Sequence, residues 1–236
     1  MEDLNDALRS AALNGDLPLV KSLMARGADI LAKDEVFCSA LGRAAEEGHL
    51  PVVEYLVEHG NADYDDALVK AAGGGHLSVV EFLVARGADV RAGDDARSAP
   101  LCVAAYGGHL TVVDFLWQRD QTHADEALCQ AAESGSLEVV KFLAARFDFR
   151  ADGGRALMMA IGEDHLPVVA CLVGMGETIS ADMLSEATTR GHVAIAEFLV
   201  AQRAHVAEQA VAPKSGKRRE RDDEDRAGGG GKHGRK

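Results

Sequence analysis

The sequence predicts an all-α helical repeat solenoid of about seven helix pairs, on three observations. A Gly-His-Leu tripeptide, or a close variant of it, recurs along the chain. A pair of small residues precedes each copy, and a longer run of apolar residues follows it. The copies are separated by 33, 27, 33, 27, 29 and 27 residues, which is the regularity of a repeat architecture. They begin at Gly15, Gly48, Gly75, Gly108, Gly135, Asp164 and Gly191.

The composition fits an array with thin interfaces. Of the 236 residues, 47% are apolar and 5% aromatic, so the core must consist mainly of Ala, Leu and Val. Residues 1–212 carry 33 acidic and 16 basic side chains, and such a body repels phosphate backbones. We therefore expect a protein partner with a basic segment, whose association the acidic surface would accelerate, and no nucleic acid bound to the body.

The first helix of each unit ends in the small pair, of which Ala44-Ala45 and Ala71-Ala72 are typical. Small side chains allow neighbouring helices to approach closely. The glycine that follows, such as Gly48, supplies the left-handed backbone that ends a helix.

The second helix carries one apolar stripe. Val52, Val53, Leu56 and Val57 fall at i, i+1, i+4 and i+5, which is one face of a helix. Trp117 occupies the position of Val57 in its own unit, so we expect it in the core. Neither helix can bury its stripe alone, and the units must therefore stack.

Residues 39–50, S-A-L-G-R-A-A-E-E-G-H-L, resemble the ankyrin repeat pattern T-P-L-h-x-A-A-x-x-G-H-L, and residues 99–101 restore its Pro-Leu. Residues 27–30 and 87–90 resemble the G-A-D-V/I that opens the β-hairpin finger of that family. The resemblance extends over about residues 2–207. It implies an ankyrin-type solenoid.

The connections between units differ in length. An ankyrin repeat has about 33 residues, so the 27-residue intervals have lost about six, between one second helix and the next first helix. The connections at 27–39 and 87–99 are long enough for a full finger, and that at 147–156 is intermediate. We expect only short or clipped β-hairpin fingers. The alternation resembles the ankyrin arrays of amoebae and their large DNA viruses.

The pattern stops near Ala212. We assign residues 1–211 to an ankyrin repeat domain and residues 212–236 to a disordered, charged, Gly-rich tail, because the tail has almost nothing apolar to bury. Its basic cluster at 217–219 is a candidate nuclear-import signal, and the alternative is a tail that adds solubility.

No apolar run approaches the ~18 residues that a membrane helix needs, and the N-terminal residues lack the apolar segment of a signal peptide. The spacing of Cys38, Cys102, Cys129 and Cys171 fits neither a zinc site nor a disulfide framework. We expect buried thiols in a reducing compartment. The prediction is a soluble monomer of the cytoplasm or nucleus that does not bind membranes.

Candidate catalytic and metal-binding groups do not converge. Five histidines occupy one repeat position, so they fall in separate units, and we expect each to orient its turn by hydrogen bonding. The glycines at 73–75 follow a helix and lack the Lys-Ser/Thr of a phosphate loop. A thin solenoid offers its carboxylates no desolvated pocket. We expect no enzyme, cofactor or metal. The five histidines are His49, His76, His109, His165 and His192.

The resemblance implies a binding surface. In ankyrin repeat proteins partners dock on the concave face, which is formed by the finger tips and the two residues after each Ala pair. Carried over to this sequence, that surface has two aromatic anchors, Phe37 and Tyr106, and an acidic rim. The expected partner-binding residues are Asp34, Glu35, Phe37, Glu46, Glu47, Asp94, Asp95, Arg97, Tyr106 and Glu133.

The leading functional prediction is a non-enzymatic protein-interaction module that binds a partner on its concave face. Two alternatives stay open. One is an adaptor that recruits substrates to a ubiquitin ligase, although the sequence shows no extra ligase-docking segment. The other is a nuclear factor that acts through its basic tail.

Overall fold

A computed structural model describes residues 4–33, 38–60, 63–93, 95–148 and 154–211, with side chains to residue 206. Within these residues the chain forms fourteen helices and no strand, so the prediction of an all-α repeat solenoid is confirmed. The basic tail lies outside the described residues. The helices are α1 (Leu4–Leu13), α2 (Leu17–Ala25), α3 (Ala40–Glu46), α4 (Leu50–His59), α5 (Tyr64–Gly74), α6 (Leu77–Ala85), α7 (Pro100–Tyr106), α8 (Leu110–Trp117), α9 (Ala124–Glu133), α10 (Leu137–Ala144), α11 (Arg155–Gly162), α12 (Leu166–Gly174), α13 (Ala181–Arg190) and α14 (Val193–Val211).

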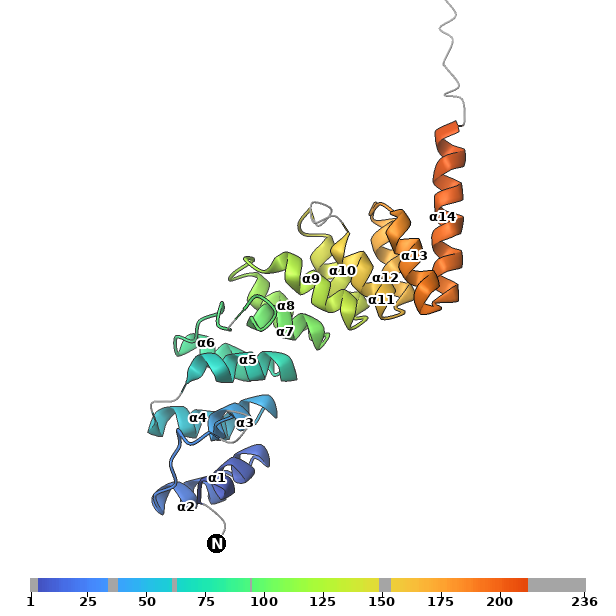
Figure 1. Ribbon diagram of the computed structural model, residues 1–236. Helices are drawn as coiled ribbons and strands as arrows, with labels where there is room; N and C mark the ends of the chain where they lie inside the picture. The colour runs from blue at the N-terminus through green and yellow to red at the C-terminus, as the bar shows by residue number, and fades with distance from the viewer. Residues whose placement is uncertain (1–3, 34–37, 61–62, 94, 149–153, 212–236) are drawn as a thin grey trace, which may run out of the picture.

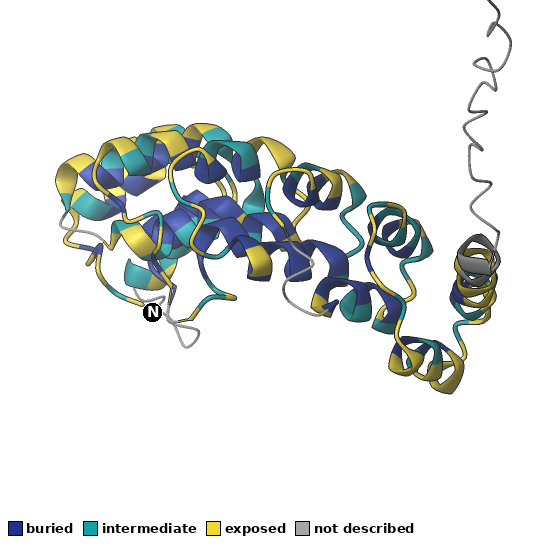
Figure 2. Cartoon of the chain, turned by 90° about the horizontal axis from the view of Figure 1, so that it is seen from above, coloured by how far each residue is buried: buried dark blue, intermediate teal, exposed yellow. Residues whose placement is uncertain are grey.

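The helices form seven pairs that stack in chain order along an arc (Figure 1). Each odd-numbered helix is the first helix of its repeat. It packs against the second helix of its own repeat and against the first helices of the neighbouring repeats. Helices α1, α3, α5 and α7 lie toward the inner side of the arc. Figure 2 shows the buried residues as a band that runs through the interior of the stack.

The interface between repeats is built on the alanine pairs. Ala44, Ala45, Ala71 and Ala72 have no exposed surface, because the first helices on both sides pack directly against them. Leu56 of the apolar stripe is also fully buried. One continuous core therefore runs along the array, as stacked units with thin interfaces require.

Trp117 lies in this core, as its sequence position predicts. Its side chain is 8% exposed. The indole meets the ring of Phe142 edge to face, with 6.4 Å between the ring centroids, and lies 6.0 Å from the ring of Phe147. Both phenylalanines belong to the fifth repeat, so the single tryptophan of the chain reports on the joint between the fourth and fifth repeats.

The turn histidines hold neighbouring repeats together. Each Nε2–H donates to the carbonyl at or near the end of the preceding first helix, because a carbonyl can only accept. The prediction that these side chains work by hydrogen bonding is confirmed, and the bonds also cross from one repeat to the next. The pairs are His49 with Leu13 at 2.9 Å, His76 with Glu46 at 2.8 Å, His109 with Gly73 at 2.9 Å, His165 with Glu133 at 3.0 Å and His192 with Gly162 at 3.2 Å.

The glycine of the tripeptide is required by the same arrangement. Gly48 has a φ of +75°, which L side chains rarely adopt. A Cβ at Gly48 would also lie 2.3 Å from Nδ1 of His76 in the next repeat. Glycine therefore ends the helix and makes room for the bridging ring.

The joint between the fourth and fifth repeats lacks this histidine. Ser136 stands in its place, and its hydroxyl pairs with the hydroxyl of Ser134 at 2.9 Å. A serine side chain is too short to reach the end of the preceding first helix. This joint therefore depends on other contacts, including those of Trp117.

The last repeat differs from the others. Thr188 replaces the second alanine of the pair and is exposed. Helix α14 has 19 residues, whereas α4 has 10 and α8 has 8, and it extends beyond the stack (Figure 1). Val200 on α14 is 53% exposed, although the equivalent Val57 is 6% exposed beneath the next repeat.

We predict that Leu56→Ala lowers the free energy of unfolding by about 2–5 kcal/mol, because it leaves a cavity in the stacking core. Glu47 is exposed and directly follows helix α3, so Glu47→Ala should change the free energy of unfolding by less than about 0.5 kcal/mol. Urea unfolding followed by circular dichroism measures both, and equal losses would show that the helix faces are misassigned.

We predict that Ser136→His stabilises the protein by about 0.5–1.5 kcal/mol, because it supplies the missing bond between repeats. Ser136→Ala, which loses the contact with Ser134 and gains none, is the control. Urea unfolding followed by the fluorescence of Trp117 observes this joint directly. A histidine variant no more stable than the alanine variant would contradict the prediction.

Candidate binding groove on the first helices

The inner side of the arc carries a row of residues from the ends of the first helices. They occupy one repeat position, directly after the alanine pair, and follow one another along the stack. Glu46, Gly73, Tyr106 and Glu133 form the middle of this row. The structure therefore places three of the predicted binding residues, Glu46, Tyr106 and Glu133, at one repeat position along the stack.

A hollow of about 410 Å³ lies at the centre of the groove, across the third, fourth and fifth repeats. Glycines and Val103 supply its small and apolar lining, Tyr106 supplies an aromatic ring, and α9 supplies polar groups. We call it the central hollow. Its lining residues are Gly73, Arg97, Val103, Tyr106, Gly107, Gln130 and Glu133.

Tyr106 is an exposed aromatic residue at this hollow. It is the last residue of α7, and its side chain is 51% exposed. Large aromatic groups open to solvent on a folded surface are the typical anchors of protein interfaces. The other predicted anchor, Phe37, lies outside the described residues, as do Asp34, Glu35 and Asp94.

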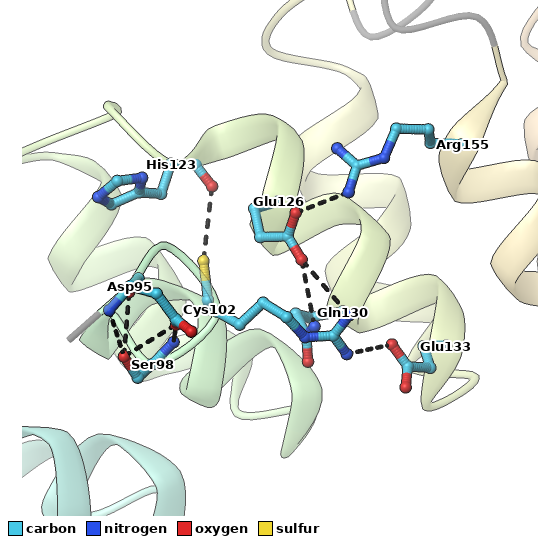
Figure 3. Close-up of polar contacts among 9 residues, drawn as sticks. Asp95, Ser98, Cys102, His123, Glu126, Gln130, Glu133 and Arg155 are labelled. Atoms are coloured by element: carbon cyan, nitrogen blue, oxygen red, sulfur yellow. Dashed lines mark hydrogen bonds and ion pairs between the residues drawn. The ribbon is translucent and has the colours of Figure 1, made fainter. Parts of the chain in front are cut away.

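Arg97 contacts three side chains on one face of α9. Its Nη2 donates to Oε2 of Glu133 at 2.7 Å, and Nη1 lies 3.9 Å from Oε1 of Glu126. Glu126, Gln130 and Glu133 are spaced i, i+4 and i+7, which places them on one stripe of the helix (Figure 3). The predicted residues Arg97 and Glu133 are therefore partners of each other across two repeats.

The Gln130 amide completes the set of contacts to Arg97. In one orientation its nitrogen donates to Glu126 at 3.3 Å. In the other, its oxygen accepts from Nε of Arg97 at 2.8 Å and from Nη2 at 2.7 Å. The second orientation is favoured, because two short charge-assisted bonds replace one long bond.

Glu126 is a buried carboxylate that links three repeats. It is 8% exposed, and its Oε2 accepts from Nη2 of Arg155 at 2.8 Å (Figure 3). Arg97 comes from the connection before α7, Glu126 from α9 and Arg155 from the start of α11. Such a network fixes the geometry of the polar side of the hollow, because a buried carboxylate is stable only when it is paired.

The remaining predicted residues lie around this centre. Asp95 is exposed, and its Oδ1 accepts from the backbone N–H of Ser98 at 2.9 Å. That bond and the Ser98 hydroxyl hold the pKa of Asp95 below its usual range. Glu46 is half-buried with an Oε2 3.6 Å from Nη1 of Arg43, and Glu47 is exposed. Asp95 thus shapes its own loop, whereas Glu47 is open to solvent.

A family model described as ankyrin repeats in three copies matches residues 8–94, 71–151, 101–183 and 128–210. The chain belongs to the ankyrin repeat family. Ankyrin repeats are generally protein–protein interaction modules and are typically non-enzymatic. The chain is similar to the ankyrin repeat proteins RF_p14 and RF_pd14 of Rickettsia felis. It is 40% identical to each over 53 residues, which is 22% of this chain and 84% and 80% of those proteins.

Two residues that line the central hollow were not predicted from the sequence. Val103 and Gln130 lie three residues before Tyr106 and Glu133, and residues three apart share a helix face. That periodicity could have predicted both. The family resemblance pointed only to the finger tips and to the two positions after each alanine pair.

A second hollow, of about 440 Å³, lies beside the N-terminal end of α5. It is lined by both charge signs, and Nζ of Lys33 lies 3.7 Å from Oδ2 of Asp63. Oδ2 of Asp66 is buried there and accepts no hydrogen bond from the described residues. Burial, with Asp63 beside it, raises the pKa of Asp66. The Asp66 side chain was not singled out by the sequence reasoning for any site.

The described residues contain no group of three or more His, Cys, Asp or Glu side chains that could hold a metal. Likewise, none of the described helices is long and apolar enough to cross a membrane. Cys38, Cys102 and Cys129 are buried, as predicted, and Cys171 is half-buried. Burial raises the pKa of the Cys102 thiol to about 12.

We predict that Cys102 alkylates on the order of a thousand times more slowly than an ordinary thiol in the native protein at mildly alkaline pH. The thiolate is the reactive form, and a pKa of about 12 keeps nearly all of the thiol protonated. Cys171, which is more accessible, should react first. Mass spectrometry after timed iodoacetamide treatment measures both sites, and labelling in urea is the control. Early labelling of Cys102 would contradict its burial.

Proposed function

We propose that this chain is a non-enzymatic interaction protein that binds a segment of another protein along its ankyrin groove, centred on the central hollow. The observation that carries the proposal is Tyr106. An aromatic side chain that is 51% exposed stands on the lining of a hollow on the inner face of the array. Interfaces of this kind depend on a few aromatic or arginine anchors near their centre.

The arrangement of the polar groups supports the same proposal. Arg97 and Glu133 are already held in place by hydrogen bonds, so less side-chain entropy is lost when a partner binds. Glu46 and Glu47 extend the acidic surface toward the N-terminal repeats. We infer that the partner segment is basic and partly apolar, because opposite charges accelerate association.

No observation favours the two alternatives over this proposal. The described helices all belong to the seven repeats, so they do not include a separate ligase-docking element. The basic tail lies outside the described residues, and nuclear import stays a prediction from its sequence.

We predict that Tyr106→Ala weakens binding of groove-selected peptides by more than about 2 kcal/mol, because it removes the central anchor. Peptides are selected from a random library on the immobilised full-length protein, and their affinities are measured by isothermal titration calorimetry. Leu19→Ala is the matched control, since Leu19 is 42% exposed on the second helix α2, outside the groove.

Unchanged circular dichroism and melting temperature would show that the Tyr106 variant folds. If the selected peptides then bind Tyr106→Ala as tightly as the original protein, or depend on Leu19 instead, the groove is not the binding site.

A further inference from the structure

Three glycines end helix α5, and the fold requires two of them. Gly75 has a φ of +78°, the left-handed conformation that closes the helix. A Cβ at Gly74 would lie 2.3 Å from the carbonyl oxygen of Glu46 in the preceding repeat. At Gly73, by contrast, a Cβ would lie 3.9 Å from Cβ of Val103, which is an ordinary contact distance.

The fold therefore has room for a side chain at position 73. Glycine weakens a helix relative to alanine, because it loses more backbone entropy on folding, so its presence here has no explanation in packing. The missing side chain has one evident result. Gly73 lines the central hollow, and any larger residue at this position would fill part of it.

The lining of the hollow defines the group that it fits. Gly73 and Val103 offer a narrow apolar surface, and Tyr106 offers a half-exposed ring. Glu133 engages Arg97 through Oε2, while its Oε1 accepts no hydrogen bond from the described residues. An aliphatic stem that ends in a positive charge matches all three features, since cations are attracted both to carboxylates and to aromatic faces. The guanidinium of Arg97 also lines the hollow, but it is bound to Glu133 and to Gln130.

An anionic group matches less well. The guanidinium of Arg97 already donates to Glu133, and to Gln130 in the favoured orientation of that amide. A carboxylate entering the hollow would compete for these donors and would face the charge of Glu133. The excess of acidic residues in the body disfavours it further.

We propose that the central hollow is a pocket for one lysine or arginine side chain of the bound segment. The stem lies over Gly73 and Val103, and the charged head meets the ring of Tyr106 and Oε1 of Glu133. This inference rests on the proposed function and names the chemistry that the groove recognises. Gly73 is a specificity-determining residue, because its lack of a side chain keeps the pocket open.

The test begins with peptides selected from a random library on the immobilised full-length protein. We expect the enriched peptides to share one fixed lysine or arginine. Replacing that residue by norleucine, which keeps the stem and removes the charge, should weaken binding more than about tenfold. Combining the norleucine peptide with Glu133→Gln should add little further loss, because both changes remove the same contact.

Variants at Gly73 test the pocket itself. Gly73→Leu should lower the affinity of the selected peptides more than about tenfold, and Gly73→Ala should lower it less. Gly174→Leu is the matched control. Gly174 ends the second helix α12, and a Cβ there would meet nothing within 4 Å. The melting temperature of each variant shows whether it folds, and the space above Gly73 leads us to expect that it does.

The outcomes separate this inference from the proposed function. Enriched peptides that share an acidic or uncharged anchor would overturn the cation pocket. So would peptides that need Tyr106 but bind Gly73→Leu normally, although groove binding would then stand. Peptides whose affinity changes with neither Tyr106 nor Gly73 would overturn the proposal of groove binding as well. The failure to enrich any peptide would count against both proposals.

Discussion

The close approach of neighbouring first helices is the constraint on which the rest of the structure depends. Ala44, Ala45, Ala71 and Ala72 have no exposed surface, and a larger side chain at these positions would push the repeats apart. At this separation an imidazole from one turn can reach the end of the preceding first helix, as His76 reaches the carbonyl of Glu46. The same spacing aligns the residues after the pairs into a groove. The stacking of the repeats, the histidine bonds between them and the binding surface thus all follow from the close approach of the first helices.

The repeat could be predicted from sequence because each of its parts has a local signal. Glycine marks the end of a helix, the alanine pair marks the close contact, and the Val-Val-x-x-Leu run marks the buried stripe. The row through Glu46, Tyr106 and Glu133 was predictable for the same reason, since it follows from one repeat position. The family resemblance then indicated the concave face as the binding surface.

The central hollow itself has no local signal. It depends on which residues of different repeats lie side by side, and Arg97 and Glu133 are 36 positions apart in the sequence. The sequence presents them as two separate charged residues, whereas the structure joins them. Gly73 poses the opposite difficulty, because only the atoms around it distinguish it from Gly74 and Gly75, which the backbone needs. Places where a residue is not explained by the fold become visible only once the fold is known.

The substitution of Ser136 for the bridging histidine gives one joint of the array a different physical character. Elsewhere a hydrogen bond to a carbonyl spans the repeats, and mobile ions hardly affect such a bond. Between the fourth and fifth repeats the polar contacts include those of Arg97 with Gln130 and Glu126 and its ion pair with Glu133, which lies partly in solvent. Dissolved salt screens that attraction. The contact of Arg97 with Glu133 beside the groove is therefore more sensitive to ionic strength than the histidine bonds at the other joints.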